Sequence, residues 1–106
     1  MSTQEIANRL VELCRAGDYA TCYKELFSND AVSIEPDHAP APQRVEGIDA
    51  ILKKGEAWQQ MIEEVHGGTV GDPIVAGDQF ACTMMADWTM KGQGRSQMEE
   101  ICVYQV

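Results

Sequence analysis

The chain has 106 residues, of which 44% are hydrophobic and 24% are charged, so we expect one globular domain with a single core. Eight basic residues against seventeen acidic ones give a net charge of −9, and such a field repels phosphate backbones and anionic lipid. These values argue against roles in nucleic-acid binding or at a membrane surface.

Neither the N-terminus nor the cysteines carry a targeting or metal-binding pattern. The first residues lack a basic segment followed by an apolar one, and no apolar run reaches the length of a membrane span. The four cysteines, Cys14, Cys22, Cys82 and Cys102, have no Cys-x-x-Cys spacing and fall within apolar patterns. We therefore predict reduced core cysteines in a cytoplasmic protein, with no metal site, no redox motif and no cofactor.

Two helices are expected at the start of the chain. Ser2 and Glu5 fit a capping box that begins the first helix, and Gly17 ends it. Asp18 can cap a second helix, whose apolar side includes Tyr23.

A short strand over 31–35 follows, and it ends with a carboxylate. Glu35 is its last residue before a loop, 36–43, that contains three prolines and cannot pair inside a sheet. This loop is long enough to act as a lid, with His38 at the mouth of any pocket beneath it. Residues 44–46 can return as a brief edge strand.

A third helix is expected from Gly47 to about Glu63, with Trp58 on its buried side. Gly55 lies inside this helix, where glycine costs about 1 kcal/mol relative to alanine. Close packing of the helix backbone against a sheet would explain this glycine.

The rest of the chain alternates apolar and polar residues over 64–76, 79–91 and 95–106, which is typical of antiparallel strands. In the middle strand one face carries Phe80, Cys82, Met84, Ala86, Trp88 and Met90, and we expect it to face the helices. A three-residue loop, Gly92-Gln93-Gly94, would set Lys91 opposite Arg95 and Trp88, Ala86, Met84 and Cys82 opposite Met98, Glu100, Cys102 and Tyr104. A two-residue loop would instead turn Glu99, Ile101 and Val103 inward.

The order of elements predicts an α+β fold in which three N-terminal helices cover one face of a mainly antiparallel sheet. Residues 15–18, 26–36 and 45–48, together with the three long strands, resemble the nuclear-transport-factor-2-like superfamily, which includes ketosteroid isomerases and SnoaL-like polyketide cyclases. The resemblance covers nearly the whole chain, as a single domain over residues 1–106. It implies a strongly curved sheet that forms a cone with an internal, mostly apolar pocket. It also implies a final strand next to the short hairpin, beyond the position of Val106 where this sequence ends, so we expect either a truncated chain or another element in that place.

The resemblance implies a role for Glu35, because in ketosteroid isomerases the residue before the corresponding proline is the base that moves the substrate proton. The two partner groups of that mechanism are not kept: Leu10 stands at the position of the tyrosine donor and Cys102 at that of the protonated acid. Steroid isomerisation by the family mechanism is therefore not supported.

Ten residues are candidates for a site. Glu35 is the candidate base, Glu100 a candidate proton donor if it faces inward, and His38 could orient a substrate. The candidates for ligand contact are Tyr23, Trp58, Phe80, Met84, Trp88, Cys102 and Tyr104. The alternatives are an exposed glutamate at a strand end, a solvent-facing Glu100 and an ordinary core. An exposed pair between Glu35 and Arg44 would remove the catalytic interpretation.

Three functions fit these residues. The first is an isomerase, cyclase or dehydratase that moves a proton on a small carbonyl compound with Glu35 as base. The second is a non-catalytic pocket for a small apolar ligand. The third is a dimerisation module with a residual cavity. For any of these we expect a homodimer formed by the outer sheet face, where Ala81, Thr83, Met85 and Thr89 lie.

Overall fold

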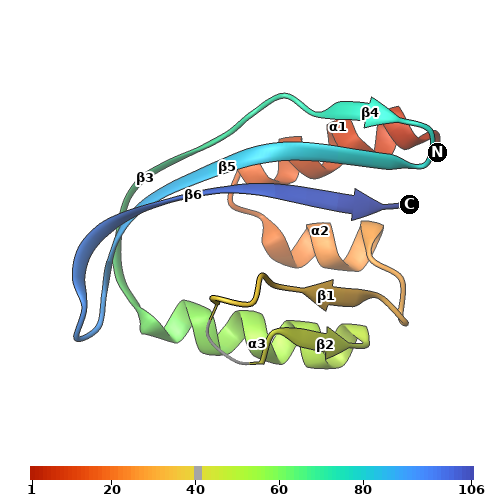
Figure 1. Cartoon of the computed structure of the whole chain (residues 1–106). Coiled ribbons are helices and arrows are strands. Elements are labelled where there is room, and N and C mark those ends of the chain that lie inside the picture. The colour runs from red at the N-terminus through yellow and green to blue at the C-terminus, as the bar shows by residue number, and fades with distance from the viewer. Residues whose placement is uncertain (40–41) are drawn as a thin grey trace.

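The computed structural model describes residues 1–39 and 42–106. Part of the predicted lid, Pro40 and Ala41, therefore lies outside the described residues. The elements follow in the order α1 (Thr3–Arg15), α2 (Tyr19–Leu26), β1 (Val32–Ile34), β2 (Arg44–Glu46), α3 (Ile48–Met61), β3 (Ile62–Val70), β4 (Ile74–Ala76), β5 (Gln79–Met90) and β6 (Gly94–Gln105). Figure 1 shows their arrangement, and the α+β prediction is confirmed.

The helix boundaries follow the expected caps. The Ser2 hydroxyl accepts a hydrogen bond from the Glu5 backbone N–H, and the Glu5 carboxylate accepts one from the Ser2 N–H. The Asp18 carboxylate accepts a hydrogen bond from the Thr21 N–H and so caps α2. Gly17 has a φ of 72°, which permits the sharp turn between α1 and α2.

The main sheet is antiparallel and is centred on β5. One edge of β5 pairs with β3 and then β4, and the other pairs with β6 along its whole length. The predicted strand over 64–76 is therefore two strands, interrupted between Val70 and Ile74. The Arg15 guanidinium of α1 holds this break in place by donating to the Val70 carbonyl oxygen.

The pairing of β5 with β6 differs from the prediction by two residues. Met90 pairs with Gly94 and Phe80 with Tyr104, so the three-residue loop consists of residues 91–93. The loop begins one residue earlier than expected because the Lys91 N–H donates to the carbonyl oxygen of Met61, the last residue of α3. The shift is even, so each side chain of β6 keeps its predicted face.

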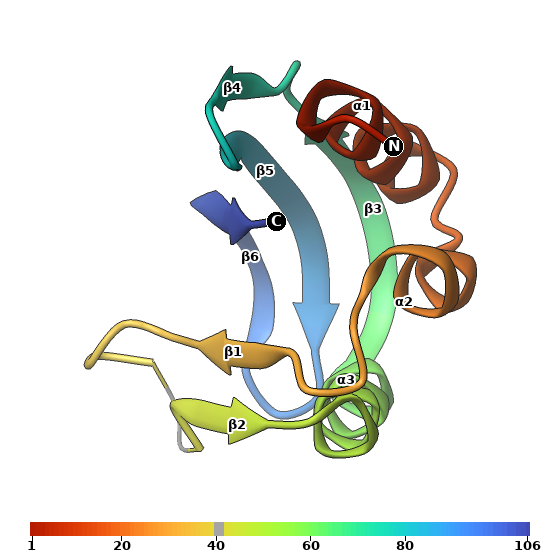
Figure 2. The same ribbon diagram turned by 90° about the vertical axis from the view of Figure 1, so that its right-hand side faces the viewer.

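Helices cover the concave side of the curved sheet, and the whole has the form of an open cone (Figure 2). The buried core lies where α1 and α2 meet β5, and it consists of Ala7, Leu10, Val11, Leu13, Cys14, Cys22, Phe80 and Cys82. At the other end of β5, the Trp88 ring meets the Trp58 ring of α3 edge-on at 5.7 Å. The predicted inner face of β5 is therefore confirmed, and Asp87 lies on the opposite face, paired with Arg95.

The explanation offered for Gly55 is wrong. A Cβ at this position would meet nothing within 4 Å, so the backbone of α3 is not pressed against the sheet there. Close approach occurs instead at Gly68, where a Cβ would lie 2.9 Å from the Met85 carbonyl oxygen.

In the part of the chain that the structure describes, no helix is long and apolar enough to cross a membrane.

Candidate functional site

Glu35 lies just beyond β1 and points to the inner side of the short hairpin. Its N–H donates to the Gln43 carbonyl oxygen at 2.7 Å, which continues the hairpin ladder past Ile34. Side chains alternate along a strand, so Glu35 shares the side of Ser33, whose cross-strand partner is the buried Val45. The strand end thus aims the Glu35 carboxylate toward α3.

The partner of Glu35 is Lys54 of α3, not Arg44. The distance from the Lys54 Nζ to the Glu35 Oε1 is 3.3 Å, and the side chains are 26% and 38% exposed. Arg44 pairs instead with Glu46 on the same strand, at 3.0 Å. The exposed Glu35–Arg44 pair, which would have removed the catalytic interpretation, does not form.

Lys54 belongs to the inner face of α3. Residues three and four apart lie on one side of a helix, so Ile51, Lys54, Gly55 and Trp58 form one row. Ile51 is buried, and Trp58 contacts Trp88 of β5. Lys54 therefore lies about one helical turn before Trp58 on the same side of α3.

Glu100 lies on the inner face of β6, because it pairs with Met84 across the ladder. Its Oε1 accepts a hydrogen bond from the Cys102 Sγ at 3.5 Å, and its side chain is exposed. Burial raises the pKa of Cys102 to about 12, with the Glu100 carboxylate adding to the effect. The inner face of β6 thus offers one carboxylate and one protonated thiol.

Tyr104 and Tyr23 pack rather than line an open space. The Tyr104 ring stacks on Phe80, with ring centroids 4.8 Å apart, and burial raises the pKa of its hydroxyl. The Tyr23 ring meets Phe27 edge-on, also at 4.8 Å. Phe80 is buried within the core cluster, against which Met84, Cys102 and Tyr104 pack. Phe80, Met84, Cys102 and Tyr104 therefore belong to the packed core beneath α1 and α2.

His38 is exposed on the loop after β1. The Gln43 side-chain amide braces this loop by donating to the carbonyl oxygens of Asp37 and Ala39, at 2.6 and 3.0 Å. The loop therefore has an internal support, although the structure does not bring His38 into contact with Glu35 or Glu100.

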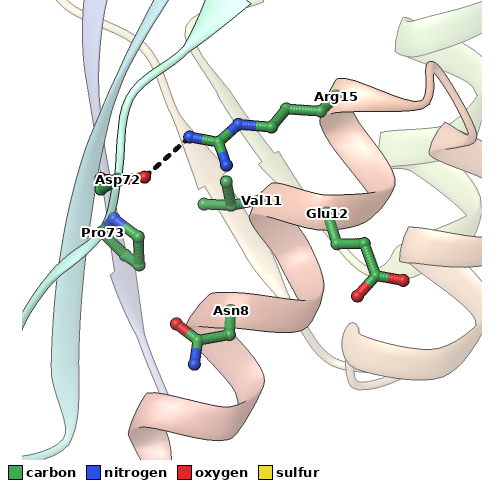
Figure 3. Close-up of a pocket in the computed structure, with 6 residues that line it drawn as sticks. All are labelled: Asn8, Val11, Glu12, Arg15, Asp72 and Pro73. Atoms are coloured by element: carbon green, nitrogen blue, oxygen red, sulfur yellow. Dashed lines mark hydrogen bonds and ion pairs between the residues drawn. The ribbon is translucent and has the colours of Figure 1, made fainter.

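Two surface grooves lie away from the predicted residues. One has a volume of about 310 Å³, and its lining residues are shown in Figure 3: Asn8, Val11, Glu12, Arg15, Asp72 and Pro73. Arg15 and Asp72 form an ion pair of 2.9 Å within it. The other, of about 630 Å³, surrounds the start of α3 and is lined by Asn29, Glu46, Gly47, Ile48, Asp49, Ala50 and Lys53. Neither groove contains Glu35, Glu100 or Trp88.

Sequence reasoning missed Lys54. The signal was present in its spacing from Ile51 and Trp58, which places the ammonium on the inner face of an amphipathic helix.

The sequence did not reveal that the four cysteines lie near one another. Cys14 and Cys22 belong to one core cluster with Cys82, and Cys82 pairs with Cys102 on the adjacent strand β6. Among residues 1–39 and 42–106, no group of three or more histidine, cysteine or acidic side chains could hold a metal ion.

Comparison with known proteins identifies the family of this chain. Among solved structures, the chain is similar to a protein from Mesorhizobium loti provisionally described as a SnoaL-like polyketide cyclase, with 37% identity, a TM-score of 0.91, and coverage of 100% of this chain and 90% of the other. It shares its fold with a Xanthomonas campestris protein of unknown function with a cystatin-like fold (16% identity, TM-score 0.80, coverage 100% and 81%). The same holds for a protein from Bacillus subtilis provisionally described as an isomerase (20% identity, TM-score 0.77, coverage 100% and 81%). A comparison with curated proteins finds no match. The family model described as a SnoaL-like domain matches residues 1–106, and the chain therefore belongs to the SnoaL-like domain family.

Proposed function

We propose that this protein binds a small carbonyl compound on the inner face of the cone and moves a proton on it, with Glu35 as the general base. The observation that carries the proposal is the Glu35–Lys54 pair, which is directed to the inner side of the hairpin. The Glu35 side chain is 38% exposed, so its carboxylate is accessible to a ligand. A positioned carboxylate of this kind is a common general base.

The surroundings of Glu35 support binding of an apolar ligand. Trp58 follows Lys54 by one turn on the same side of α3, contacts Trp88 of β5, and is 39% exposed. Met84 lies two inward-facing positions from Trp88 on β5 and packs, with Cys102 and Tyr104, against the core that contains Phe80. Tyr23 contacts Phe27, which packs against the same core. Aromatic rings and a thioether offer apolar contact area, while the carboxylate supplies orientation.

Glu100 and His38 have secondary roles in this proposal. Glu100 shares the inner side of the cone and would serve as a proton donor for the product. His38, on the braced loop, would orient the substrate as it enters. The family neighbours described as a polyketide cyclase and an isomerase support the same class of reaction, namely proton transfer next to a carbonyl group.

The test is the exchange of the α-hydrogens of small cyclic ketones with deuterated water, followed by NMR. Wild-type protein should catalyse exchange, and Glu35→Gln should lower the rate by about 100-fold or more while the fold is kept. Glu46→Gln is the matched control, because Glu46 is a strand glutamate that pairs with Arg44 rather than with Lys54. Full activity in Glu35→Gln would refute the assignment of the base. Binding without exchange in the wild type would favour the non-catalytic pocket.

We also propose that a second copy of the chain covers the outer face of the sheet. Three large apolar side chains are exposed there in neighbouring positions: Ile74, Ile101 and Val103, at 77%, 72% and 69%. Ile74 and Val103 both pair with Ala81, and Ile101 pairs with Thr83 next to it, so the three form one patch across the sheet. A patch of this kind on the outer face of the sheet suits an isologous two-fold contact.

The oligomeric state tests this second proposal. Sedimentation equilibrium should give a dimer at micromolar concentration, and Ile101→Glu should shift it to a monomer because it buries a charge in the contact. Ile34→Glu is the control, since Ile34 is 69% exposed on the short hairpin. A monomeric wild type would exclude the dimer.

A further inference from the structure

We infer that Lys54 is the anion-binding group of this site, and that it holds the enolate oxygen formed when a ketone loses its α-proton. The inference rests on the proposed function, because it assigns the substrate class as an enolisable ketone. It gives a catalytic role to a residue of α3 that sequence reasoning did not select. Three properties support this role: the free donors of Lys54, its shielding from water, and the charge of the chain.

The ammonium of Lys54 has donors to spare. It carries three N–H groups, and one of them is used in the hydrogen bond to the Glu35 Oε1. No further hydrogen bond of this ammonium is found within residues 1–39 and 42–106. The 3.3 Å distance is also longer than the roughly 2.7–2.9 Å of a tight charge-assisted bond. Lys54 can therefore donate a hydrogen bond to a second oxygen without breaking a strong contact.

The neighbouring lysine shows that this placement is specific. Lys53 is exposed and lines the groove at the start of α3, whereas Lys54 is 26% exposed and faces the inner side. A charge partly shielded from water acts more strongly on a nearby anion than a solvated one does. The stem of Lys54 lies one turn from Trp58, which favours binding of a ligand with an apolar body.

The charge of the chain favours a cationic group at this place. The candidate base Glu35 and the candidate proton donor Glu100 both lie on this side, and the whole chain carries a net charge of −9. Once Glu35 has taken the proton it is neutral and no longer pairs with Lys54, while the net negative charge of the chain still disfavours an enolate. The Lys54 ammonium offsets that effect at the point where the oxygen becomes negative.

The proposed step balances without any further reagent. The Glu35 carboxylate takes the proton from the carbon next to the carbonyl, and the C–H electron pair forms the C=C bond of the enolate. The carbonyl π electrons move onto the oxygen, which the Lys54 ammonium then holds. The Glu35 carboxylic acid returns the proton to carbon, the C=O bond forms again, and Lys54 returns to Glu35.

The test uses 2-naphthol, whose ionised form resembles a flat enolate and has its own absorbance spectrum. Binding of the neutral and anionic forms is compared by titrating the bound ligand with pH. Wild-type protein should favour the anion, and Lys54→Met should reduce that preference by about 10-fold or more. Lys54→Arg should restore most of the preference because it restores the charge. Lys53→Met is the matched control and should behave as wild type.

The outcomes separate this inference from the function on which it rests. If wild-type protein binds neutral 2-naphthol without any preference for the anion, Lys54 is not the anion-binding group, and the pocket proposal stands. If neither form binds, the pocket itself is refuted, and the role of Lys54 with it. Thermal unfolding of Lys54→Met shows whether a loss of binding follows from a loss of fold, in which case the Arg variant decides.

Discussion

Replacing Gly55 with alanine should stabilise the protein. Gly55 lies in the interior of α3, and a Cβ added there would meet nothing within 4 Å. Gly55 is not one of the glycines with a positive φ, so an alanine at this position can adopt the same backbone conformation without strain. Alanine in a helix interior is favoured over glycine by about 0.8–1 kcal/mol. With no contact to offset this gain, the free energy of unfolding should rise by about that amount and the Tm by about 4 °C.

The assay is urea and thermal unfolding followed by circular dichroism. Gly68→Ala is the control with the opposite expected sign, because its Cβ would lie 2.9 Å from the backbone oxygen of Met85 and force the strands apart. Gly55→Ala should gain stability while Gly68→Ala loses it. A loss of stability in Gly55→Ala would refute the conclusion that the inner face of α3 leaves open space at this position.

Three further predictions concern a cap, a titration and a thiol. Ser2→Ala should lower the free energy of unfolding by about 1 kcal/mol in urea titrations, because it removes the acceptor for the Glu5 N–H; no loss would contradict the cap. The hydrogen bond from Arg95 lowers the pKa of Asp87, so this pair stabilises the fold above the pKa of an unfolded aspartate. That contribution should be lost as the pH falls from about 4 through the lowered pKa, and Asp87→Asn should flatten this part of the stability profile; an unchanged profile would contradict it. Burial raises the pKa of Cys102 to about 12, so iodoacetamide should label it slowly in native protein and rapidly after unfolding, as read by mass spectrometry.

Local chemistry made much of the fold predictable. The Ser2 capping box, the Asp18 cap and the turn at Gly17 each depend on a few neighbouring residues, and all three form as expected. The period-2 pattern of β5 placed Trp88 on the helix side and Asp87 on the outer side, because alternation along a strand needs no knowledge of its partners.

The features that sequence reasoning missed depend on contacts between distant residues. The start of the β5–β6 loop is set by a hydrogen bond from Lys91 to Met61, 30 residues earlier in the numbering, which no local pattern reveals. The partner of Glu35 is Lys54 because the hairpin lies beside α3, so the ion pair follows from tertiary packing. The absence of a backbone neighbour at Gly55 follows from the spacing between α3 and the sheet.

The central claim is that ligands bind on the inner face between α3 and β5, and the two tryptophans report on this place. The chain has two tryptophans, Trp58 and Trp88, and their rings contact each other there. The most direct measurement is an NMR titration of the two indole N–H signals with 2-naphthol in wild-type protein and in Gly55→Leu. We predict that both signals shift saturably in the wild type and that the leucine, which fills the open space, abolishes the shifts. Saturable binding that leaves both indole signals unmoved would contradict the claim and place the ligand elsewhere.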